Sequence, residues 1–140
     1  MSLFNIFDVA GSGMSAQSIR LNTVASNLSN ADNLSGTPEG AYRAKEPVFA
    51  AIYGAMQGSG SGNNVDGVRV ASINESNAPI QTRYMPGNPL ADAKGYVYGS
   101  NVNPIEEMVN MISASRSYQN DVEVMNTSKQ MLLRTLTLGN

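Results

Sequence analysis

The sequence contains no cysteine and no histidine among its 140 residues. Without cysteine there is no disulfide and no thiolate nucleophile, which suits a protein that passes through an oxidising compartment without an isomerase. Without histidine the chain lacks the side chain that most often moves protons near neutral pH. Because both residue types are the usual zinc ligands, a zinc site is disfavoured as well. We therefore expect no enzyme activity, no metal and no cofactor.

Charged residues are scarce too, at 14% of the chain against the usual quarter. The net charge is −2, and the nine lysines and arginines are scattered along the sequence. Nucleic-acid binding needs concentrated positive charge to neutralise phosphates, so we expect no nucleic-acid partner. A surface this poor in charge predicts that neighbouring molecules cover much of it.

Long apolar runs are also missing, since none approaches about 18 residues, and we expect no direct membrane insertion. The first basic residue is Arg20, and no compact apolar core follows a positive segment, so we expect no Sec-type signal peptide. Binding to a membrane surface is disfavoured because the polar face of the N-terminal segment carries Ser, Asn and Gln rather than Lys.

Helix-breaking residues divide the chain into three parts. All six prolines lie between positions 38 and 104, and ten of the thirteen glycines lie between 36 and 99. The sequence thus predicts a mixed α/β (α+β) fold. Residues 1–35 and 103–140 are expected to form a discontinuous helical domain with coiled-coil-like pairing, and residues 36–102 a small β-rich, Gly/Pro-rich middle segment.

The first part predicts a helix from about Leu3 to Asn30. Its apolar residues recur in steps of four and three, the pattern of a helix that packs along another helix. The stripe consists of Leu3, Phe7, Ala10, Met14, Leu21, Val24 and Leu28, with Gln17 as its polar member. Two glycines so close together, in Gly11-Ser12-Gly13, cost roughly 1 kcal/mol each relative to alanine, which predicts a kink or weak point.

The last part carries the clearest helix start. Asn103 suits the N-cap, Pro104 the first helical position and Glu106 the N3 position of a capping box. The apolar stripe that follows consists of Ile105, Met108, Ile112, Ser115, Tyr118, Val122, Met125, Lys129, Leu132 and Leu136, with Gly139 placed to end the helix. At a rise of about 1.5 Å per residue the two helices are expected to be about 40 and 50 Å long, more than the middle can cover.

The middle predicts short strands and turns. Residues 48–53 and 68–70 alternate in character, and residues 80–84 suggest a third strand. The Gly/Ser-rich stretch at 58–67 predicts a flexible loop. It matches neither the dinucleotide fingerprint nor the P-loop, because it lacks the third glycine and the lysine. Pro86-Gly87-Asn88-Pro89 predicts a turn.

The acidic pairs do not suggest a metal site. Glu106 and Glu107 are adjacent on a predicted helix and point in different directions, and acids at a helix start favour the macrodipole. Asp121 and Glu123 lie two apart and cannot converge either.

The apolar stripes allow two interpretations. Periodicity alone favours an ordinary core within one chain, as in a free-standing helical adaptor. The placement of the helices at opposite ends, their length and the low charge favour contacts between subunits. A group of asparagines at the end of the first helix leaves the same choice open, because amides can end helices and form turns or bond between subunits. The group consists of Asn22, Asn27, Asn30 and Asn33.

Two sets of motifs resemble the flagellar rod and hook family. Near the N-terminus these are LFNIFDVAGSGMSAQ at 3–17, RLN at 20–22 and ASNLSNA at 25–31, where Ser29 stands in place of the usual alanine. A second set resembles the proximal rod members of that family. It consists of YRAK at 42–45, PGNPLAD at 86–92, GYV at 95–97, EMVN at 107–110, SASRSYQ at 113–119 and TLTLG at 135–139.

The resemblance implies a structural, self-assembling subunit of the proximal rod without catalysis. It implies a place in the periplasm-spanning rod of the flagellar basal body, after export by the flagellar type III system without a cleaved signal peptide. The implied partners are the chain itself, the other proximal and distal rod proteins, the basal-body adaptor and the export apparatus, with no small-molecule substrate. The polymer would be the drive shaft that transmits torque and encloses the export channel.

The apolar members of the two stripes are the residues expected at the subunit interface. They are Leu3, Phe7, Met14, Leu21, Val24, Leu28, Ile105, Met108, Ile112, Tyr118, Val122, Met125, Leu132 and Leu136.

Overall fold

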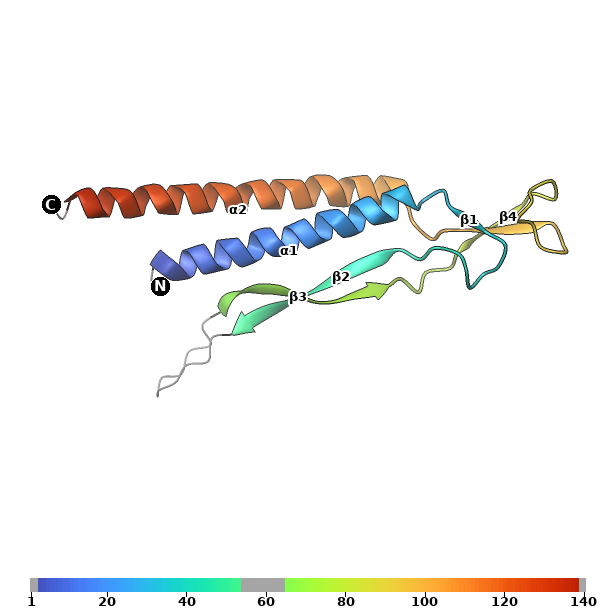
Figure 1. Ribbon diagram of the computed structural model, residues 1–140, viewed down its shortest axis with the longest axis horizontal. Helices are drawn as coiled ribbons and strands as arrows, with labels where there is room; N and C mark the ends of the chain where they lie inside the picture. Colours follow the sequence, from blue (N-terminus) through green and yellow to red (C-terminus); the bar gives the residue numbers. More distant parts are fainter. Residues whose placement is uncertain (1–2, 54–64, 139–140) are drawn as a thin grey trace.

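Two long helices and two small antiparallel sheets make up the described part of the protein (Figure 1), so the predicted α+β class is confirmed. The computed structural model describes residues 3–53 and 65–138. The predicted loop at 58–67 and the helix end at Gly139 therefore lie largely outside the described residues. The elements are α1 (Leu3–Ser29), β1 (Leu34–Ser35), β2 (Lys45–Tyr53), β3 (Val65–Glu75), β4 (Gln81–Tyr84), β5 (Tyr96–Gly99) and α2 (Pro104–Leu138).

Helix α1 is the middle layer of the long part of the molecule. Helix α2 packs along one side of it, and the β2–β3 hairpin packs along the other (Figure 1). Strands β1, β5 and β4 form a second sheet, in that order. This sheet lies at the end of the molecule farthest from the start of α1 and the end of α2, so the subunit is elongated (Figure 1).

The predicted start of α2 is confirmed. The Asn103 side-chain oxygen accepts a hydrogen bond from the Ile105 N–H at 3.1 Å, and its carbonyl accepts one from the Glu107 N–H at 3.0 Å. Pro104 is the first helical residue, where its missing N–H costs nothing. The local sequence alone therefore fixes where this helix begins.

Helix α1 buries two stripes rather than the single one predicted. Ala10 and Val24 of the heptad pattern are buried, and so are Ala16, Thr23 and Asn27. Helical spacing places the second group roughly 60–140° around the helix from the first, and Asn27 of this group contacts the hairpin. Its members are small or polar, which is why an apolar stripe does not reveal them.

The Gly11-Ser12-Gly13 patch is a site of close approach and not a break, because α1 runs through it as one helix. A Cβ on Gly13 would lie 2.8 Å from the carboxylate of Asp121 in α2. On the other side, Ser12 Oγ accepts a hydrogen bond from the Val68 N–H of β3 at 3.0 Å. The small side chains thus let two different elements reach α1.

The side chain of Asn27 joins α1 to the start of β2. Its Oδ1 accepts from the Lys45 N–H at 2.8 Å and from the Tyr42 hydroxyl at 3.0 Å, and its Nδ2 donates to the Lys45 carbonyl at 2.9 Å. Asn27 is only 1% exposed. Asn30 and Asn33 also bond locally, to Ser26 and to Asn30. These three asparagines therefore make their hydrogen bonds within the chain.

A second asparagine ties the middle segment to the entry of α2. Asn101 Oδ1 accepts from the Ala44 N–H at 2.7 Å. Its Nδ2 donates to the carbonyls of Ser76 and Ala78, at 3.2 and 3.0 Å. The segment before α2 is thereby fixed to the residues that precede β2 and follow β3, at the open end of the hairpin.

The strands predicted in the middle appear as β2, β3 and β4. Strand β2 pairs with β3 from Lys45↔Glu75 to Tyr53↔Val65, with two irregularities in register. Strands β1 and β5 were not predicted, because β1 has only two residues and β5 carries little alternation. β5 nonetheless contributes Val97, which is fully buried.

Asp92 organises the connection between β4 and β5. Its Oδ1 accepts from the N–H groups of Lys94 and Tyr96, at 2.8 and 2.9 Å, and its Oδ2 accepts from the Tyr98 hydroxyl at 3.1 Å. The bond from the Tyr96 N–H is the main cause that holds the pKa of Asp92 below its usual value. Gly95 has φ +82°, and a Cβ there would meet the Tyr84 ring at 2.9 Å. The predicted turn at residues 86–89 is confirmed within this connection.

Replacing Asn27 by alanine should destabilise the subunit by about 2–3 kcal/mol, because the backbone groups of Lys45 lose their partner in a buried place. Asn22→Ala on the same helix is the matched control, since Asn22 is exposed, and should change stability by no more than about 0.5 kcal/mol. Urea unfolding of the two purified variants measures the difference. Equal midpoints would show that Asn27 does not hold the hairpin.

Gly67→Ala should cost about 1–3 kcal/mol, because the new Cβ would lie 3.0 Å from the Cβ of Ser12 and collide with its hydroxyl. The control is Gly87→Ala, where a Cβ would meet nothing within 4 Å in the described chain. Thermal melts of both variants provide the comparison. A melt of Gly67→Ala that matches the parent would mean that β3 does not lie this close to α1.

Candidate assembly surface

The interior of the subunit is built from small residues. Its buried apolar side chains are Ala10, Ala16, Val24, Ala41, Ala44, Val97, Val102 and Ala114. Val97 is the largest fully buried one. The larger apolar side chains of the described residues are consequently half-buried or exposed.

The outward face of the first turns of α2 carries the clearest exposed apolar group. Ile105, Met108, Val109 and Ile112 are 69%, 48%, 61% and 55% exposed. Their spacing of three and four places them on one face of the helix. We call this group the α2 outer patch. Ala114, on the opposite face, is fully buried. One face of α2 therefore packs inside the subunit, and the other face is exposed on it.

A second apolar surface lies between the start of α1 and the later half of α2. A groove of about 270 Å³ there is lined by Ile6, Val9 and Val124, with Asp121 beside them. Val9 and Val124 are 42% and 46% exposed. Met131 extends the apolar lining along α2.

The residues predicted for the interface fall into distinct groups. Five are exposed, namely Ile105, Met108, Ile112, Tyr118 and Leu136. Seven are half-buried, namely Phe7, Met14, Leu21, Leu28, Val122, Met125 and Leu132. Val24 is buried inside the subunit, and the side chain of Leu3 is outside the described part. The outward surface therefore includes only part of the predicted stripes, and Val24 does not belong to it.

Several exposed apolar residues were missed by the sequence analysis. They are Val109, Val124, Met131 and Leu133. They lie off the predicted heptad stripe, because that stripe includes only about one residue from each helical turn. An apolar count around the whole circumference of the predicted helix would have found them, because α2 is apolar on more than one side.

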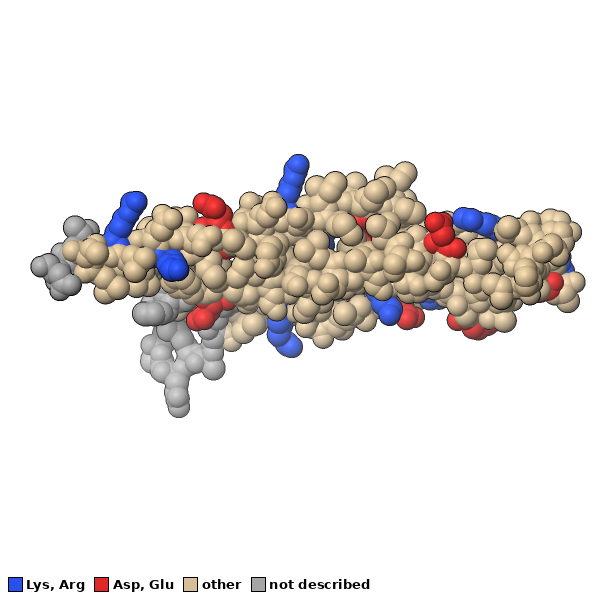
Figure 2. Space-filling view, turned by 45° about the horizontal axis from the view of Figure 1, so that its top comes forward, with Lys and Arg blue, Asp and Glu red and all other residues tan. Residues whose placement is uncertain are grey.

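Charge is sparse on the face shown in Figure 2, where a few acidic and basic side chains are scattered over a largely uncharged surface. Among the described residues, no three acidic side chains gather as a metal site would require. Within the same residues, neither helix has an apolar stretch long enough to cross a membrane.

Two family models match the two helical regions. The model described as "Flagella basal body rod protein" matches residues 7–33, which hold most of α1 and the loop after it. The model described as "Flagellar basal body rod FlgEFG protein C-terminal" matches residues 93–138, which hold β5 and α2.

Full-length relatives give a more specific assignment. The flagellar basal-body rod protein FlgC of Escherichia coli O6:H1 is 57% identical over 139 residues, which cover 99% of both chains. FlgC of Salmonella typhimurium is 56% identical over the same length and coverage. FlgC of Buchnera aphidicola from Acyrthosiphon pisum is 44% identical over 141 residues, again with 99% of both chains covered. The resemblance noted in the sequence is confirmed, and the chain belongs to the FlgC family of flagellar basal-body rod proteins.

Proposed function

We propose that this chain polymerises with copies of itself and with sibling proximal and distal rod proteins into the drive shaft that transmits torque across the periplasm. In this proposal the shaft also encloses the export channel, and the chain arrives through the flagellar type III system without a cleaved signal peptide. Its further contacts are with the basal-body adaptor and the export apparatus. The family is a structural one, which agrees with the expectation that the chain is not an enzyme.

The observation that carries the proposal is the α2 outer patch on a subunit whose fully buried apolar side chains, in the part that the structure describes, are alanines and valines. Contiguous apolar groups of this kind on soluble proteins mark surfaces that other molecules cover. Burying one such side chain contributes roughly 1.5–3 kcal/mol. Four neighbouring residues on one helix face can therefore supply much of the free energy of a subunit contact.

The terminal helices suit a role as the inner layer of the proposed tube. They lie side by side in the subunit, and Arg20 of α1 donates to Asn110 of α2 at 3.3 Å. The close fit at Gly13 and Asp121 brings their axes near to each other. We propose that this pair acts as a unit with coiled-coil-like packing, and that the outer patch extends the packing to the next subunit.

The location can be tested directly in cells. Basal bodies isolated from cells that make the chain should contain it, and cells that lack it should form no rod and should not swim. A rod that assembles normally in its absence would contradict the proposal.

Ile112→Asp should block rod assembly while leaving the isolated subunit folded, because the side chain is 55% exposed in the subunit and would place an unpaired carboxylate at a dry contact after assembly. The control is Ala114→Asp, two residues away and fully buried, which should lower the thermal melt of the isolated subunit. Val122, another residue of the predicted stripe, is a less suitable position for this test, because it is half-buried in the subunit and its substitution would affect folding as well.

The two variants separate assembly from folding. Loss of swimming with an unchanged melt for Ile112→Asp supports the assembly surface. Normal rods with Ile112→Asp would show that the α2 outer patch is not part of the interface. A large drop in the melting temperature of this variant would show that Ile112 belongs to the core of the subunit.

A further inference from the structure

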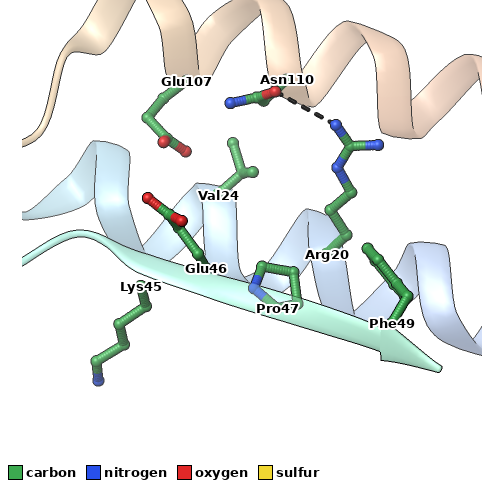
Figure 3. Close-up of a pocket in the computed structure, with 8 residues that line it drawn as sticks. All are labelled: Arg20, Val24, Lys45, Glu46, Pro47, Phe49, Glu107 and Asn110. Atoms are coloured by element: carbon green, nitrogen blue, oxygen red, sulfur yellow. Dashed lines mark hydrogen bonds between the residues drawn. The ribbon is translucent and has the colours of Figure 1, made fainter. Parts of the chain in front are cut away.

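A groove of about 390 Å³ lies where α1, α2 and β2 meet (Figure 3). Its apolar lining comes from Val24, Pro47 and Phe49. Glu107 of α2 and Glu46 of β2 extend into it and point their carboxyl groups toward one another (Figure 3). The groove therefore brings two acidic side chains from different elements face to face.

The basic groups around this groove do not pair with the two acids. Arg20 of α1 donates its guanidinium to Asn110 instead, and Lys45 of β2 points away from the groove (Figure 3). Glu107 Oε2 is buried and has no hydrogen-bond partner in the described chain. A buried carboxylate oxygen without a partner is costly, because it gives up its hydration and gains nothing in return.

The surroundings of Glu107 favour its protonated form. Burial is the main cause that raises its pKa above the ordinary value of 4.5, and the negative charges of Glu46 and Glu106 act in the same direction. The Asn27 amide and Arg20 act in the opposite direction, and the net shift is upward. The Asn27 amide donates its well-formed hydrogen bond to the Lys45 carbonyl. This agrees with the finding that Asn27 lowers the pKa of Glu107 less than burial raises it.

We propose that Glu46 and Glu107 form a proton-linked contact that holds the β2–β3 hairpin to α2. A proton on Glu107 lets its carboxyl group donate a hydrogen bond to the Glu46 carboxylate. Loss of this proton leaves two like charges facing each other in a half-enclosed groove. Release of the proton loosens the hairpin from α2, while the Asn27 bonds still hold it to α1.

The sign of the pH dependence follows from the upward shift. The folded chain holds the Glu107 proton more tightly than the unfolded chain does. The contact therefore adds stability that is fully present below pH 4.5 and is lost as the pH rises through the elevated value. Over this window the parent protein should become more stable as the solution is acidified.

Glu107→Gln should remove this dependence, because the amide keeps the shape of the protonated acid without its charge. At neutral pH the variant should melt roughly 2–4 °C above the parent, and the difference should vanish on acidification. Glu46→Gln should give a similar gain and should lower the titration midpoint of Glu107, followed by carboxyl carbon NMR of the full chain. Glu123→Gln is the matched control, since Glu123 is an exposed acid farther along the same helix and should give no such gain.

Three results would overturn the proposal. The first is a Glu107 midpoint at or below 4.5. The second is a lower melt for Glu107→Gln at neutral pH. The third is a rise in the melt of the parent, but not of Glu107→Gln, when calcium chloride alone is added, because the groove would then hold a cation and not a proton.

Discussion

The arrangement of the subunit depends on one buried amide. The side chain of Asn27 offers a donor and an acceptor with the spacing of a peptide group, and Lys45 pairs with both as it would with a neighbouring strand. This contact fixes the start of β2 on the last turns of α1. The hairpin then has to run back along the helix, which brings Val68 to Ser12 near the other end. A buried polar group is tolerated here because its bonding capacity is used.

Polar contacts set the positions of the elements, whereas apolar burial inside the subunit is modest. Asn27, Asn101 and Ser12 each join segments far apart in the sequence, and the residues between them in the interior are mostly alanine and valine. Hydrogen bonds contribute about 1 kcal/mol each in net terms, so they specify register more than they stabilise. In the proposed polymer the missing apolar burial comes from neighbours, whose association stabilises the folded form by mass action.

Local signals in the sequence were sufficient for some elements and not for others. The start of α2 was predictable because Asn103 and Pro104 act within one turn. The role of Asn27 was not, since its partner lies 18 residues away, and the same holds for Ser12, whose partner lies 56 residues away. The heptad rule found only one of the two buried stripes of α1, because this helix has partners on two sides. On α2 it found Ile112 but missed Val109, because apolar residues there cover more than one stripe.

The two helices also differ in length, and this difference bears on assembly. α2 has 35 residues and α1 has 27, and the last turns of α2 extend beyond the start of α1 (Figure 1). Leu133 and Leu136 belong to the last two turns of α2 and are 54% and 62% exposed. An apolar helix end without a neighbour is marginal by itself, since isolated helices gain most of their stability from packing. In the proposed polymer another subunit supplies the partner of this end of α2, while the α2 outer patch offers a second contact near the other end of the same helix.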